Sequence, residues 1–135
     1  MKLRVVPKIY TTYFAQLRNL PQNIVPISIC GKAPNWYKGL QYKKLAPKYS
    51  FFSVWKETKD NNYYIEHFNK EVLSELKQSE VIKELRILSN NHSIALVCYE
   101  KPSDFCHRHL VSKWFKDANI EVEEWRNKNE NSSKI

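Results

Sequence analysis

One short run of apolar residues constrains the fold of this chain more than any other feature. Residues 93–98 read Ser-Ile-Ala-Leu-Val-Cys, a length and composition typical of a buried parallel strand. The stretch that begins at Cys106 instead repeats apolar residues at helical spacing: Leu110, Val111, Trp114, Phe115 and Ala118. A buried strand followed by an amphipathic helix predicts a parallel α/β unit.

The rest of the chain fits the same architecture. Further strands are predicted at 5–10, 24–30 and 120–125, and three helices between residues 50 and 89, with breaks near Asp60 and Ser79. Pro26 favours an edge position or a late start for the second strand. Thr11 or Thr12 would cap a short helix before Pro21.

We therefore predict one three-layer α/β domain with a small, mainly parallel sheet of about four strands flanked by helices. It spans residues 1–126, and a polar, flexible tail follows at 127–135. The chain has 135 residues, of which 42% are hydrophobic, enough to bury a core without disulfides or a structural metal.

Composition also bears on location and redox state. No run is long enough to span a membrane, and the first residues lack the apolar stretch of a secretory signal, so we expect no membrane partner. Three cysteines, an odd number, do not form a disulfide framework. We expect a cytoplasmic protein with free thiols.

Positive charge is concentrated in one segment. The formal net charge is +8, and residues 31–59 contain seven lysines against the single acidic residue Glu57. Seven aromatic residues lie in the same segment: Trp36, Tyr37, Tyr42, Tyr49, Phe51, Phe52 and Trp55. Bases interleaved with rings suit a surface for phosphates and stacked nucleobases. The alternative is that the rings form core and the lysines their solvated rim.

Chemically capable side chains gather between the strand at 93–98 and the following helix. They are Cys98, Glu100, Lys101, Cys106, His107 and Arg108. Ligands of open α/β sheets bind beyond the carboxyl ends of the strands, where helix N-termini favour anions. With Ser103 or Asp104 as N-cap, Cys106 would lie in the first turn and its thiolate would be stabilised. This crossing is therefore the predicted pocket.

The candidate catalytic residues are Cys106 as thiolate nucleophile, His107 as proton shuttle and Glu100 as acid or base. Neighbouring helical residues project about 100° apart, so Cys106 and His107 need not form a dyad. Each residue also has a structural alternative. Cys98 suits a buried core position, His107 suits a bond to a backbone group, and Arg108 can simply cover a surface.

Metal and cofactor chemistry are weakly indicated. Cys98, Cys106 and His107, with Glu100, could supply zinc ligands, but seven residues separate the two cysteines rather than the two to four usual in zinc motifs. The two glycines, Gly31 and Gly39, form neither a phosphate-binding loop nor a dinucleotide fingerprint. We predict no metal and no cofactor.

At these residues the chain resembles the family called domain of unknown function 488 (DUF488). Its pattern is a strand that ends in Cys-x-Glu and a helix that opens with Cys-His-Arg, matched by Cys98, Glu100 and residues 106–108. The stretch 45–47 and the aromatic helix after it also look like one branch of the family. The resemblance covers most of 24–125 and departs at 10–14, where many relatives have a Gly-containing turn. It implies an α/β sandwich and a shared pocket, with no established reaction.

The predicted function is binding of a phosphorylated ligand, either a nucleotide or nucleic acid, at this crossing, with thiol chemistry at Cys106 as a further option. The predicted ligand contacts are Arg108, Lys101, Thr11, Thr12, Lys43, Lys44, Trp36 and Tyr37. The alternative is a non-catalytic nucleic-acid-binding or protein-binding module that uses the basic aromatic segment 31–59.

Overall fold

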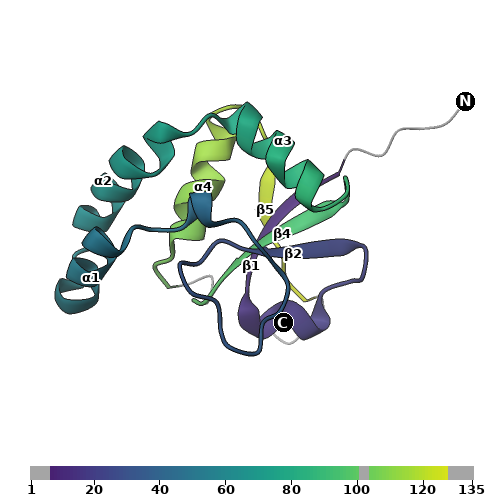
Figure 1. Ribbon diagram of the computed structural model, residues 1–135, viewed down its shortest axis with the longest axis horizontal. Helices are drawn as coiled ribbons and strands as arrows, with labels where there is room; N and C mark the ends of the chain where they lie inside the picture. Colours follow the sequence, from purple (N-terminus) through teal and green to yellow (C-terminus); the bar gives the residue numbers. More distant parts are fainter. Residues whose placement is uncertain (1–6, 101–103, 128–135) are drawn as a thin grey trace, which may run out of the picture.

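The computed structural model describes residues 7–100 and 104–127, and its centre is an all-parallel sheet (Figure 1). The strands in these residues are β1 (Ile9–Tyr13), β2 (Ile24–Ser28), β3 (Leu40–Gln41), β4 (Ser93–Cys98) and β5 (Val122–Glu124). Their order in the sheet is β3-β2-β4-β1-β5. The predicted α/β class and the parallel sheet are confirmed. The additional strand, β3, lies in a stretch for which the sequence predicted neither a strand nor a helix.

The first strand starts later than predicted, and Val5 and Val6 lie outside the described residues. Ile9 of β1 pairs with Ile94 of β4 on one side and with Val122 of β5 on the other, which sets the register by apolar positions. The β-branched Thr11 and Thr12 are therefore buried strand residues. Neither caps a helix, because the 3-10 helix η1 (Phe14–Asn19) begins beyond them without a side-chain cap.

Pro26 lies inside β2, which is the second strand of the sheet rather than an edge. It lies opposite Ala95 of β4, whereas the short β3 pairs only with Ile27 and Ser28. Pro26 consequently has no partner in β3, and a residue without an N–H is tolerated at such a place.

Three α-helices follow β3, as predicted: α1 (Tyr49–Thr58), α2 (Asn61–Glu71) and α3 (Gln78–Leu88). The break after α1 falls at Lys59, whose φ of 58° ends the helix, and at Asp60, whose carboxylate accepts a hydrogen bond from the Tyr63 N–H. The second break precedes Gln78 and so falls slightly before Ser79. The remaining helices of the described residues are two short 3-10 helices, η2 (Lys43–Leu45) and η3 (Leu73–Glu75), and the α-helix α4 (His107–Lys116). No helix described in 7–100 or 104–127 is long and apolar enough to cross a membrane.

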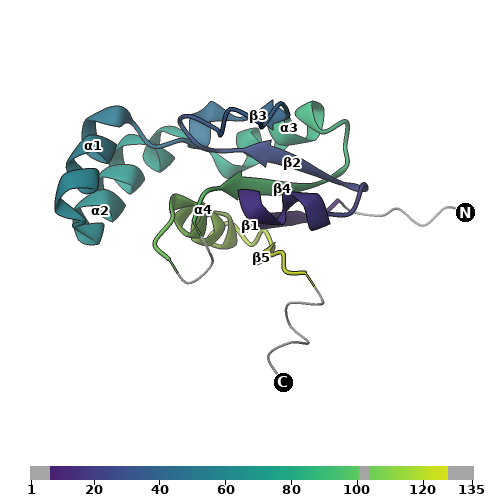
Figure 2. The same ribbon diagram turned by 90° about the horizontal axis from the view of Figure 1, so that it is seen from below.

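The described residues form two apolar cores against the sheet. The larger one joins Leu96 of β4 to residues of α1, α2, α3 and α4, whereas the next residue, Val97, belongs to a smaller core with Phe14 of η1 and Tyr37. Alternate side chains of a strand point to opposite faces, so α-helices cover one face and η1 with the loop after β2 covers the other. In both ribbon views α1 and α2 lie side by side at one end of the molecule (Figure 2).

Candidate functional site

A pocket of about 480 Å³ lies beyond the carboxyl ends of β2 and β4, where the sequence predicted a ligand site. Its walls come from the segment after β2, from α1 and α2, and from the crossing between β4 and α4. Six aromatic residues line it: Tyr49, Phe52, Trp55, Tyr64, Tyr99 and Phe105. The aromatic helix α1 therefore does border the site, as expected for a part of the basic aromatic segment.

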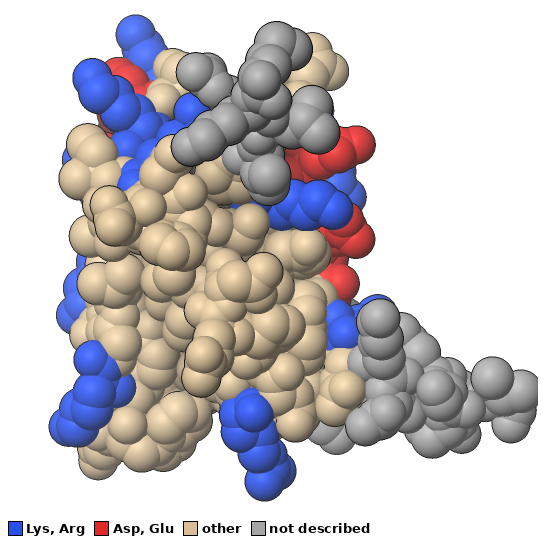
Figure 3. Space-filling model, turned by 90° about the vertical axis from the view of Figure 1, so that its right-hand side faces the viewer, with Lys and Arg blue, Asp and Glu red and all other residues tan. Residues whose placement is uncertain are grey.

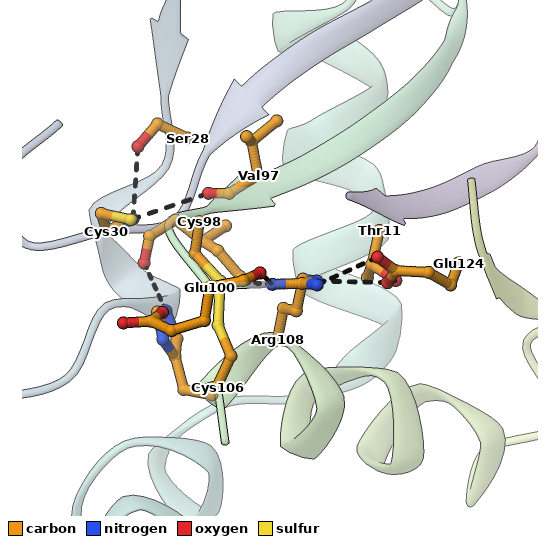
Figure 4. Close-up of a disulfide and its surroundings, with 11 residues drawn as sticks. Thr11, Ser28, Cys30, Val97, Cys98, Glu100, Cys106, Arg108 and Glu124 are labelled. Carbon is orange, nitrogen blue, oxygen red and sulfur yellow. Dashed lines mark hydrogen bonds and ion pairs between the residues drawn. A yellow bond between two sulfur atoms is a disulfide. The ribbon is translucent and has the colours of Figure 1, made fainter. Parts of the chain in front are cut away.

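The two cysteines of the motif form a disulfide, which corrects the expectation of free thiols (Figure 4). Cys98 is the last residue of β4, and Cys106 is itself the N-cap residue of α4, so neither Ser103 nor Asp104 has that role. Ser103 lies outside the described residues. The spacing of the two cysteines did not reveal the bond, which depends on the end of β4 lying beside the start of α4. In this state Cys106 is not a nucleophile.

His107 is buried at the start of α4 and lines the pocket. Its Nε2 lies 2.7 Å from the carbonyl oxygen of Ile29, and since a carbonyl only accepts, Nε2 carries the proton. Burial lowers the pKa of His107 to about 4. The ring is therefore neutral near neutral pH, with the lone pair on Nδ1, and it is a weak base there.

Glu100 brings a carboxylate to the pocket and is half-buried. Its backbone carbonyl accepts a 2.6 Å hydrogen bond from Nη1 of Arg108, which fixes the chain directly after β4. Cys98, Glu100, Cys106 and His107 thus all reach the same pocket, as the motif predicted.

Arg108 does not contact the pocket, contrary to its predicted role as a ligand residue. Its side chain is fully buried and pairs with both carboxylate oxygens of Glu124, through Nε at 3.1 Å and Nη2 at 3.0 Å (Figure 4). Nη1 also donates to Sγ of Cys98 at 3.2 Å. The guanidinium therefore ties α4 to the ends of β4 and β5. It is the second residue of α4 and points into the sheet rather than toward the helix N-terminus.

The threonines predicted as ligand contacts belong to the same buried network. Thr11 donates to Glu124 Oε1 at 2.7 Å, and Thr12 donates to the carbonyl of Trp125 at 3.4 Å. Both lie in β1 and support β5, away from the pocket lining. Lys101, the remaining predicted contact near the motif, lies outside the described residues.

The other predicted contacts also lie away from this pocket. Lys43 is exposed, and Lys44 forms an ion pair of 3.0 Å with Glu84 of α3. Tyr37 is buried, and its hydroxyl donates to the carbonyl of Leu40 at 2.6 Å. Trp36 is 60% exposed and contacts the ring of Phe14 edge-on. Trp36 and Tyr37 lie on the loop that covers the smaller core, whereas Lys43 and Lys44 lie in η2.

Among the described residues, the lysines that do line the pocket are Lys32 and Lys56. Both belong to the basic aromatic segment 31–59, but neither is among the ligand contacts predicted from the sequence. Two signals could have found them. Lys32 comes just after a predicted strand, at its carboxyl end, and Lys56 follows Phe52 by four residues and so shares its helix face. Lys56 indeed lies with Nζ 5.8 Å from the Phe52 ring centre.

Cys30, the free cysteine, lies in the smaller core beside the disulfide. Burial raises the pKa of its thiol to about 12. We therefore expect iodoacetamide to leave Cys30 of the native chain unmodified at about pH 8, where only a thiolate reacts. Peptide mass spectrometry checks this, with the urea-unfolded chain as a control that must react. Rapid modification of the native chain would show that the thiol is accessible and ionised.

A parallel sheet with a Cys-x-Glu strand end and a Cys-His-Arg helix start around one pocket defines a class of small α/β proteins. The chain matches the family model DUF488-N3a, described as the active DUF488-N3 subclade, over residues 12–119. It belongs to this family, which confirms the resemblance read from the motif. No curated protein and no solved structure matches the chain.

Proposed function

We propose that the pocket binds a small phosphorylated ligand with a planar ring, such as a nucleotide. The observation that carries this proposal is the combination of aromatic walls with two lysines at the carboxyl edge of a parallel sheet. Nucleobases stack on aromatic side chains, and lysine ammonium groups pair with phosphates. This is the chemistry that a mostly apolar pocket with a few polar groups can recognise.

The rings and the lysines have separate roles in this proposal. Phe52 and Trp55 of α1 provide half-buried ring faces for the base. Lys32 and Lys56 are exposed at the pocket and take the phosphate. The backbone of Lys32 is held by the Tyr99 hydroxyl, which donates to its carbonyl at 2.7 Å. Binding does not require a free thiol, whereas chemistry at Cys106 requires that the disulfide first be reduced.

Calorimetric titration with AMP, adenosine and inorganic phosphate tests the proposal. We expect AMP to bind more tightly than either part alone, and Lys32→Ala and Lys56→Ala each to weaken AMP binding about tenfold through loss of a charge-assisted contact. Trp55→Leu is expected to weaken AMP and adenosine alike, by about tenfold, because it removes stacking.

Lys43→Ala is the matched control, since Lys43 is an exposed lysine outside the pocket lining. Its AMP affinity should equal that of the wild type. Equal losses for Lys32→Ala and Lys43→Ala would instead indicate general electrostatic attraction.

The alternative, a nucleic-acid-binding surface on the segment 31–59, is favoured by a separate observation. All seven lysines of this segment are exposed, and so are the rings of Trp36 and Tyr49. Figure 3 shows the side of the molecule that lies on the right in Figure 1. On this side Lys and Arg lie around the margin of a wide area without visible charged side chains. This side is therefore less suited to binding a polyanion. Single-stranded RNA binding that falls steeply with salt and disappears in Lys43→Glu/Lys44→Glu would favour this alternative.

A further inference from the structure

Three possible metal ligands meet at one wall of the pocket. The sulfur atoms of Cys98 and Cys106 and a ring nitrogen of His107 lie within 4.8 Å of one another. All three residues are buried, and all three line the pocket. They come from the end of β4 and the start of α4, a helix that packs against the sheet.

The hydrogen bonding of His107 is compatible with metal ligation. A ligating histidine usually donates its second ring N–H to a backbone carbonyl or a carboxylate, which fixes both the tautomer and the ring orientation. Nε2 of His107 makes such a bond to the Ile29 carbonyl at 2.7 Å. The lone pair of Nδ1 is then available for a cation.

The surroundings of the sulfur atoms suit thiolates. Nη1 of Arg108 donates to Cys98 Sγ at 3.2 Å, and hydrogen bonds of this kind support ligating sulfur. The guanidinium does not add an uncompensated positive charge beside a cation, since Glu124 neutralises it through two hydrogen bonds. Cys106, as the N-cap residue of α4, lies at the positive end of the helix dipole, which favours its thiolate.

We propose that, when the disulfide is reduced, Cys98, Cys106 and His107 bind Zn²⁺ with a fourth position open to the pocket. A dithiol reductant breaks the S–S bond, is itself oxidised to a disulfide, and leaves two protein thiols. Zn²⁺ then displaces the two thiol protons, which pass to solvent. Two thiolates and one imidazole with an open position form a known type of zinc site. The disulfide and the zinc site use the same sulfur atoms, so they exclude each other.

This inference goes beyond the proposed nucleotide binding and does not depend on it. It also revises the expectation from spacing, because the three candidate ligand atoms lie within 4.8 Å of one another although seven residues separate the two cysteines. The fourth position faces the same pocket as Glu100, so a bound cation would lie within the ligand site.

The experiment compares the reduced and oxidised full-length chain. Each is titrated with Zn²⁺ against a chromogenic competitor, and with Co²⁺ as a spectroscopic probe of tetrahedral thiolate coordination. We expect about one equivalent of Zn²⁺ and a thiolate-to-cobalt absorption band for the reduced chain only. Equal uptake by the oxidised chain, or no uptake by the reduced chain, would overturn the proposal, and this comparison requires no variant to fold.

Variants then test the ligand set, with circular dichroism as a check of folding. Cys98→Ser, Cys106→Ser and His107→Gln should each lower Zn²⁺ affinity at least about tenfold. Glutamine at position 107 retains an N–H for the Ile29 carbonyl, so its effect reports the lost Nδ1 ligand. Cys30→Ser is the matched control, a buried cysteine outside the donor set, and should bind Zn²⁺ like the wild type. Loss of binding in Cys30→Ser, or full binding in Cys106→Ser, would contradict the assignment.

Discussion

Replacing Arg108 by alanine is expected to lower the free energy of unfolding by about 3–5 kcal/mol. The arginine side chain is fully buried, and the carboxylate of Glu124 that it neutralises is only 16% exposed. Removal of the guanidinium leaves that carboxylate without its counter-ion, and the Cys98 sulfur and the Glu100 carbonyl without this donor. Urea unfolding followed by circular dichroism measures the loss.

Lys113→Ala provides the comparison for this prediction. Lys113 of α4 pairs with Asp117, the C-cap residue of that helix, but their side chains are 77% and 62% exposed, so the loss is expected within about 0.5 kcal/mol. Arg108→Met combined with Glu124→Gln should recover much of the stability, because no unpaired charge remains buried. A loss below about 1 kcal/mol for Arg108→Ala would show that water reaches the ion pair.

Reduction of the Cys98–Cys106 disulfide, without added metal, is expected to lower the free energy of unfolding by about 2–3 kcal/mol. The bond closes a short loop, and its main effect is to restrict the unfolded chain. Urea unfolding with and without a phosphine reductant measures the difference. Zn²⁺ should restore stability to the reduced chain, since a cation that binds only the folded state shifts the equilibrium toward it.

The double variant Cys98→Ala/Cys106→Ala is the control for this second prediction. It should be as unstable as the reduced wild type within about 1 kcal/mol, and it should respond neither to the reductant nor to Zn²⁺. A wild-type chain whose unfolding curve is unchanged by the reductant would show that the two sulfur atoms are not bonded in solution.

The strong patterns in the sequence predicted the fold well. The apolar run that became β4 and the periodic stretches that became α1 to α4 were each found, because buried strands and amphipathic helices have distinct repeats. β3 was missed because two residues are too few for any repeat to show. The start of β1 was misplaced because the apolar residues around Pro7 look like a strand, whereas pairing with β4 and β5 sets the real register.

The pocket lies where the sequence predicted a ligand site, but the residues that line it differ in part from the predicted ones. Adjacent residues of the motif were all assigned to the pocket, yet the first turn of α4 points His107 to the pocket and Arg108 into the sheet. The partner of Arg108, Glu124 of β5, is 16 residues away in the sequence, and a local sequence pattern cannot reveal such a pairing. The lysines that line the pocket could not be singled out for a similar reason, because exposure is common to Lys43 and Lys56 and only the packing of α1 brings the second one to the pocket.

The position of Glu124 has a practical consequence for the boundaries of this domain. The family match ends at residue 119 and begins at residue 12, so both Glu124 and Thr11, which donates to it, fall just outside the matched segment. A fragment trimmed to that segment would retain the complete Cys-His-Arg motif, but Arg108 would be buried without its counter-ion Glu124. Expression fragments of this chain should therefore extend through β5, and a soluble fold is not to be expected from the motif-bearing segment alone.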